Sequence, residues 1–133
     1  MNVEEEHKMY RFHHLHLICS NLDQMENFFT EVLGAELVER KKFGDVEGAI
    51  VDLTGTRVYL RMPREGEEIG GDLSGKHYGY DHLGLVVDDL DAAYEELRGK
   101  GFVFTLPPTG KTGRVAFFKG PDNISVELFQ PPG

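Results

Sequence analysis

The chain alternates between short apolar runs and two longer stretches in which the apolar residues have helical spacing. In residues 22–33 and 90–97, apolar side chains recur every three or four positions, which predicts two amphipathic helices. A Ser or Asn at positions 20–21 and an Asp at positions 88–89 suit the N-caps of these helices. Glycine follows both stretches, as is typical of a helix end.

Eight shorter runs, rich in β-branched and aromatic residues, indicate strands separated by turns. The predicted strands span residues 12–19, 36–43, 46–53, 56–62, 80–87, 102–106, 114–118 and 124–129. Pro107 and Pro108 should end the sixth strand, because a proline nitrogen cannot donate a hydrogen bond to a neighbouring strand. The predicted order is β-α-β-β-β, used twice, and the predicted fold class is α+β.

The chain also repeats itself at a spacing of 68 residues. His14 and His82 each open a similar phrase that leads into the cap of a predicted helix, and residues 58–60 align with residues 126–128 at the same spacing. A spacing kept at both ends of a unit indicates one structural unit used twice. Equivalent points of the two units are therefore candidates for one shared site.

These boundaries predict a single domain, because neither half is long enough to be stable alone. It spans residues 1–133, with unit one at about 11–63, a connecting loop at about 64–79 and unit two at about 80–131. The glycine-rich segment 63–79 is either a lid or a plain linker.

Composition narrows the classes of function. The net charge of −9 argues against a nucleic-acid partner or an anionic membrane surface. One cysteine excludes an intrachain disulfide, as expected in a reducing compartment. The N-terminal residues are acidic rather than signal-like, and no apolar run is long enough to span a membrane. We expect a cytoplasmic protein that acts on a small molecule.

The paired units, a histidine in the first strand of each, and the Gly-Pro-Asp-Asn-Ile-Ser-Val-Glu-Leu-Phe ending at residues 120–129 resemble the vicinal oxygen chelate superfamily. This superfamily includes glyoxalases, extradiol dioxygenases, epimerases, fosfomycin-modifying enzymes and bleomycin-binding proteins. The resemblance covers roughly residues 11–131. It implies a mixed sheet curved into a cup, with helices on the outer face, the site in the cup and often a homodimer.

Strand alternation places His14 and His16 on one face of the first strand, and Glu127 shares a face of the last strand with Ser125. If the face with His14 and His82 is the cup face, Glu127 completes a set of two histidines and a carboxylate. The resemblance places the metal ligands at these three positions. Such a set leaves open coordination positions and suits Fe, Mn, Zn or Ni without choosing among them.

Tyr59 departs from the family pattern. It aligns with Glu127 in the repeat, at a position where the resemblance implies a Glu or Gln in glyoxalases and epimerases. A phenol, with a reference pKa near 10, is a poor base at neutral pH, but it can donate a hydrogen bond. His16, opposite Gly84 in the repeat, is either a second catalytic group or a histidine that fills space. We predict Tyr59 and His16 as the catalytic residues.

Three further side chains are candidates for substrate binding. Arg57 and Arg61 have the strand parity of Tyr59, and an anionic substrate would explain two arginines on that face. The ordinary alternative is that both pair with surface acids. Phe117 is a candidate for the wall of the cup, and it stands where the dioxygenase resemblance implies a tyrosine.

Three functions remain open from the sequence. The ligand set favours a metal-dependent enzyme that acts on a small substrate with vicinal oxygens, and it resembles that of the dioxygenases. The first alternative is a glyoxalase-type lyase or isomerase, which lacks its usual carboxylate at Tyr59. The second is a metal-free binding protein of the bleomycin-resistance type, which would have no reason to keep the histidines and Glu127.

Overall fold

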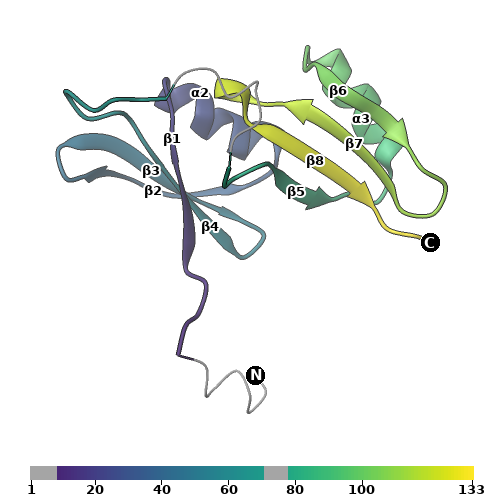
Figure 1. The fold of residues 1–133 in the computed structure, drawn as a ribbon, viewed down its shortest axis with the longest axis horizontal. Coiled ribbons are helices and arrows are strands. Elements are labelled where there is room, and N and C mark those ends of the chain that lie inside the picture. The colour runs from purple at the N-terminus through teal and green to yellow at the C-terminus, as the bar shows by residue number, and fades with distance from the viewer. Residues whose placement is uncertain (1–8, 71–77) are drawn as a thin grey trace. The chain divides into compact units, whose positions relative to one another are not determined.

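The computed structural model describes residues 9–70 and 78–133. The chain divides into two compact units, Met1–Glu67 and Glu68–Gly133. Each unit contains one four-stranded sheet and its own helix (Figure 1). Part of the segment 63–79, predicted as a lid or a linker, lies outside the described residues.

The first unit follows the predicted β-α-β-β-β order. Its elements are β1 (His14–Ile18), α2 (Leu22–Asn27), the π-helical turn η1 (Phe28–Val32), β2 (Glu36–Phe43), β3 (Val46–Leu53) and β4 (Thr56–Arg61). The strand order is β1-β4-β3-β2, with β1 parallel to β4 and the other pairs antiparallel. The Asn21 side chain accepts a hydrogen bond from the amide of Gln24 at 2.9 Å, so it is the N-cap of α2.

The second unit repeats this arrangement. Its elements are β5 (Leu83–Val86), α3 (Leu90–Gly99), β6 (Phe104–Thr109), β7 (Arg114–Lys119), the 3₁₀ turn η2 (Pro121–Asn123) and β8 (Ser125–Gln130). The strand order is β5-β8-β7-β6, with β5 parallel to β8. Asp89 is the N-cap of α3. The predicted α+β fold, with two β-α-β-β-β units and mixed sheets, is confirmed.

Several boundaries differ from the sequence prediction by a few residues, and the differences at β5 and β6 bear on the site. The predicted strand 80–87 is shorter, and β5 begins at Leu83, so His82 precedes the strand. Pro107 and Pro108 do not end their strand, because β6 continues through both of them to Thr109. β6 is an edge strand with an irregular register, so a residue there can lack an amide hydrogen without losing a partner.

Each sheet has a helix-facing side that carries the core and an opposite side that carries the polar candidates. In β4, Val58 and Leu60 are buried and alternate with Tyr59. In β8, Val126 and Leu128 are buried and alternate with Glu127. The alternation therefore assigns the candidate residues of both units to the side away from the helix. No helix in the described part of the chain is long and apolar enough to cross a bilayer.

Candidate functional site

His82 and Glu127 form a close polar pair in the second unit. The Nε2 atom of His82 lies 2.8 Å from Oε1 of Glu127, although the residues are 45 positions apart. β5 is parallel to β8, with Gly84 opposite Glu127, so His82 lies close to the carboxylate. Both side chains are partly exposed, at 31% and 23%. A small molecule or ion can therefore reach them.

A second carboxylate lies behind the same imidazole. Oδ2 of Asp81 is 3.2 Å from Nδ1 of His82. Both contacts are hydrogen bonds at the same time only when the ring carries two protons, because neutral imidazole has one donor. If a metal ion bound Nε2 instead, a neutral ring would be enough, because Nδ1 would keep its proton and donate it to Asp81. An acid placed behind a ligating histidine in this way fixes its orientation and its tautomer.

The distance between the two groups fits a shared metal ion. Two donor atoms at about 2.1 Å from a metal, at right angles to each other, lie about 3 Å apart. Nε2 of His82 and Oε1 of Glu127 have close to this separation. Within residues 9–70 and 78–133, however, no three His, Cys, Asp or Glu side chains gather as a metal-binding group. The third predicted ligand, His14, belongs to the first unit and stays a prediction.

A cavity of about 370 Å³ lies beside this pair in the second unit. Its lining combines the imidazole, an aromatic ring, an aliphatic side chain, two hydroxyls and both signs of charge. The lining residues are Asp81, His82, Thr105, Leu106, Phe117, Lys119 and Ser125. The ring of Phe117 meets that of His82 edge-on, with centroids 5.0 Å apart. This size and mixture suit a small, partly polar ligand.

The corresponding face of the first unit carries an aromatic cluster. The rings of His14 and Tyr59 are stacked, 3.9 Å apart and only 8° from parallel. His16 and Phe43 join them, with ring centroids 4.8 Å apart. Nδ1 of His14 lies 2.8 Å from Nδ1 of His13, so one of these atoms donates and the other accepts. This contact engages Nδ1 of His14, so a metal ion would bind the other ring nitrogen, Nε2.

His16, one of the two predicted catalytic residues, lies within this cluster. Its pKa is lowered, first by burial and then by the neighbouring His14, Arg61 and Arg64. Its strand partner is Tyr59, and their rings meet edge-on with centroids 5.5 Å apart. The structure therefore brings both predicted catalytic residues together in the first unit.

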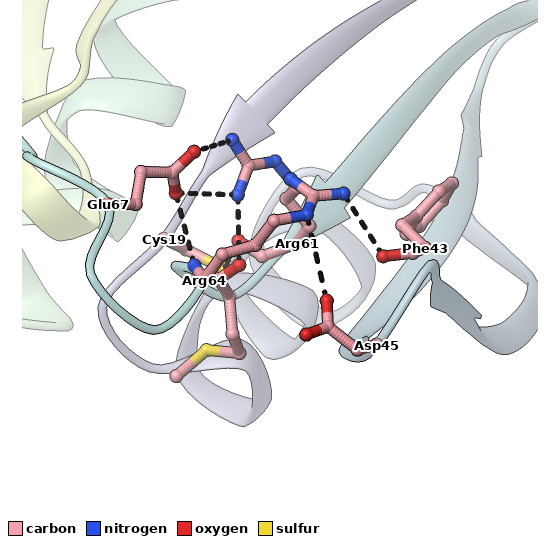
Figure 2. Close-up of polar contacts among 7 residues, drawn as sticks. Cys19, Phe43, Asp45, Arg61, Arg64 and Glu67 are labelled. Atoms are coloured by element: carbon pink, nitrogen blue, oxygen red, sulfur yellow. Dashed lines mark hydrogen bonds and ion pairs between the residues drawn. The ribbon is translucent and has the colours of Figure 1, made fainter.

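The two predicted substrate-binding arginines already have carboxylate partners. Arg57 lies 3.1 Å from Asp52, its partner in the register of β3 and β4. Arg61 makes two hydrogen bonds of 2.8 Å to Glu67, one to each carboxylate oxygen (Figure 2). The guanidinium holds the pKa of Glu67 at about 2. The ordinary alternative, pairing with the chain's own acids, describes both arginines in this structure.

Figure 2 also shows how Glu67 connects the segment after β4 to the sheet. Its Oε1 accepts a hydrogen bond from the amide of Arg64 at 3.1 Å. Arg64 in turn donates to the carbonyl oxygen of Phe43 at 3.1 Å and lies 3.7 Å from Asp45. The first residues after β4 are therefore held against the β2–β3 hairpin by charged contacts.

The sequence analysis missed three residues of these clusters: Asp81, Lys119 and Glu67. Asp81 had a usable signal, because it directly precedes a predicted ligand histidine. Lys119 and Glu67 had no such signal. The neighbours of Lys119 are set by strand pairing, and those of Glu67 are set by a loop contact. The structure places His14, His16, Arg57, Tyr59 and Arg61 in the first unit and His82, Phe117 and Glu127 in the second.

A family model, the Glyoxalase/Bleomycin resistance protein/Dioxygenase superfamily, matches residues 11–128 of the chain. The chain belongs to this superfamily. The resemblance to the vicinal oxygen chelate proteins is thereby confirmed.

Individual relatives of the chain are distant. It is 28% identical to a probable lactoylglutathione lyase of Vibrio cholerae serotype O1, over 91% of each chain. It is 31% identical to a 2-epi-5-epi-valiolone epimerase of an Actinomyces species, covering 90% of this chain and 79% of the epimerase. In fold it is similar to the fosfomycin resistance protein FosX of Listeria monocytogenes, whose structure is complexed with Mn(II) and sulfate. The TM-score is 0.69 and the identity 17%, and the match covers 92% of this chain and 93% of FosX.

Proposed function

We propose that this protein is a divalent-metal-dependent lyase or isomerase that acts on a small substrate with two neighbouring oxygens. The carrying observation is the distance of 2.8 Å between His82 and Glu127, with Asp81 behind the imidazole. These two residues would bind Fe, Mn, Zn or Ni, with His14 as the predicted third ligand. A bound divalent ion would polarise the substrate oxygens and stabilise developing negative charge.

The residues of the chain would then carry out the remaining tasks. Asp81 would hold His82 in orientation, and Tyr59 would orient His14 through the stacked rings. An isomerisation needs a group that removes a proton from one carbon and returns it to the neighbouring carbon. We assign this role to His16, with the hydroxyl of Tyr59 as a hydrogen-bond donor to a substrate oxygen. Phe117 would contact the substrate from the cavity beside His82.

The relatives favour lyase or isomerase chemistry over the dioxygenase activity that the ligand set first indicated. Two of them are named as a probable lactoylglutathione lyase and as an epimerase. Tyr59 is the main departure from this chemistry, because it occupies the position of the carboxylate expected there. The proposal therefore requires another group to move the proton, which is why His16 is included. The homodimer implied by the resemblance is part of the proposal as well.

Metal binding is tested by calorimetric titration of chelator-treated protein with Mn, Ni, Zn and Fe(II). We expect about one ion per chain in the unmodified protein, and binding weakened at least about 100-fold in His82→Ala and Glu127→Gln. Glu95→Gln is the matched control, because Glu95 is an exposed residue of α3 whose carboxylate lies 3.7 Å from Arg98. An unmodified protein that takes up none of these ions would rule out the proposed enzyme and favour a metal-free binding protein.

The reaction class is tested on the metal-loaded protein. We would incubate it in D₂O with small 2-hydroxyketones and with thiol adducts of 2-oxoaldehydes, and follow the carbon-bound protons by NMR. Exchange or rearrangement that is lost in His16→Gln supports the lyase or isomerase. Oxygen consumption with catechols, without proton exchange, would instead support the dioxygenase.

A further inference from the structure

The two units differ at one equivalent pair of strand positions on the sheet side that faces away from the helix. In the first unit, Asp52 is opposite Arg57, and the two form an ion pair of 3.1 Å. In the second unit, the equivalent positions hold Lys119 opposite Ser125. The acid–base pair has become a lysine beside a hydroxyl. The charge of Lys119 is therefore not balanced by the residue across the strand.

Lys119 lines the cavity beside His82 and is half-buried there. In the described part of the chain, its ammonium group forms no ion pair, whereas most described arginines have a carboxylate within 4 Å. One acid, Asp81, also lines the cavity, but it lies against His82. A half-buried cation has lost part of its hydration, which costs free energy. A ligand of opposite charge compensates for this cost.

The rest of the lining indicates what such a ligand contains. Thr105 and Ser125 contribute hydroxyls, which donate to oxygen acceptors, and Leu106 and Phe117 contribute apolar surface. The chain has a net charge of −9, so its general field repels anions. A protein with this net charge therefore needs a local cation, with hydroxyl groups beside it, to bind an anion.

We propose that Lys119, with Thr105 and Ser125, binds an oxyanion of the ligand, a carboxylate or a phosphoryl group, while Phe117 and Leu106 contact its apolar part. This assignment rests on the proposed function, because it places the anion in the cavity that also contains His82. It makes the substrate a small anionic molecule. It also moves the anion-binding role predicted for Arg57 and Arg61 to a residue of the second unit.

The test is a titration of the full-length protein with inorganic phosphate and, separately, with propionate, at low ionic strength. Binding is followed by ¹H–¹⁵N NMR of the β7 and β8 amides, before and after chelator treatment. The variants are Lys119→Gln, Lys119→Arg and Lys111→Gln. Lys111 is a matched control, because it is exposed in the β6–β7 turn, at the opposite end of the hairpin from Lys119.

We expect Lys119→Gln to weaken binding by about tenfold or more, because it removes a charge-assisted hydrogen bond. Lys119→Arg should keep binding within about threefold, since the charge is kept, and Lys111→Gln should match the unmodified protein. The anion that binds more tightly identifies the group, phosphoryl or carboxylate.

Three results would overturn the assignment. The first is that Lys119→Gln binds the anions as tightly as the unmodified protein does. The second is that Lys111→Gln loses as much anion affinity as Lys119→Gln. The third is that the unmodified protein shows no saturable binding of either anion. Failure of the proposed function is separate, because it appears as absent metal uptake in the unmodified protein. Loss of anion binding with metal uptake intact in Lys119→Gln supports the assignment.

Discussion

The two units share one architecture but differ in what occupies the sheet side away from the helix. In the first unit this side carries four packed rings and arginines that are paired with the chain's own acids. In the second unit the same side carries a histidine–carboxylate pair and a cavity of about 370 Å³, lined by Lys119, which forms no ion pair with the described residues. One unit has side chains that satisfy one another, and the other has groups available to a ligand.

This difference shows that a repeat preserves the backbone while its sites diverge. Tyr59 and Glu127 occupy equivalent positions of β4 and β8, and so do His16 and Gly84 in β1 and β5. The ring of His16 packs beside that of Tyr59, whereas a Cβ added at Gly84 would lie 3.6 Å from Oε1 of Glu127, at ordinary van der Waals distance. The second unit therefore has no side chain beside its carboxylate at the position where the first unit has an imidazole.

The largest expected effect is on the free energy of unfolding, through the hydrophobic cores that the two units have in common. Phe29 and Phe118 are fully buried, one in each unit. Replacing either by alanine should lower the free energy of unfolding by about 3–5 kcal/mol, because it leaves a cavity. Chemical denaturation measures this, with Phe12→Ala as the control, since Phe12 is 76% exposed. If each variant shifts a different transition, the units unfold independently.

The next effect separates the equivalent residues Glu127 and Tyr59. Glu127→Gln should weaken metal binding by about 100-fold, since it removes a charged ligand. Tyr59→Phe should change it by less than about threefold, because the ring stack with His14 needs no hydroxyl. Competition with a chromophoric chelator measures both affinities. A larger loss in Tyr59→Phe than in Glu127→Gln would reverse the roles given to the two units.

A smaller effect concerns Asp81, for which the first unit shows His13 at the corresponding place before its strand. Asp81→Asn should weaken metal binding by about 10-fold, the usual range for a residue that orients a ligating histidine. The same competition assay measures the change, and Asp88→Asn serves as an exposed control on the same unit. An unchanged affinity would contradict the positioning role.

The smallest effect concerns the paired acids of the first unit. The pKa of Glu67 is about 2, below the ordinary value of about 4.3. The Arg61–Glu67 contact therefore contributes its full stability above about pH 4.3, and the contribution is lost as the pH falls toward 2. Glu67→Gln should lose less stability than the unmodified protein between pH 5 and pH 2. Thermal denaturation across this range measures the difference, and Glu65→Gln should behave like the unmodified protein.

Much of the fold could be predicted from residue patterns because the determinants are local. The spacing of apolar residues defined both helices, and the polar residues Asn21 and Asp89 cap them as predicted. The bounds of β2 and β3 also agree with the predicted runs. The β6 prediction failed because Pro107 and Pro108 are tolerated only at a sheet edge, and a sequence does not show which strand lies at an edge.

The sequence by itself determined the two β-α-β-β-β units, the family and the identity of the candidate ligands, since alternation and repeat spacing are properties of neighbouring residues. Only the tertiary structure decided which charges are already paired. Arg61 meets Glu67 through a loop, Arg57 meets Asp52 across strands, and Lys119 has a serine where the first unit has an arginine. These partners depend on strand register and loop course, which bring distant residues within a few ångströms of one another.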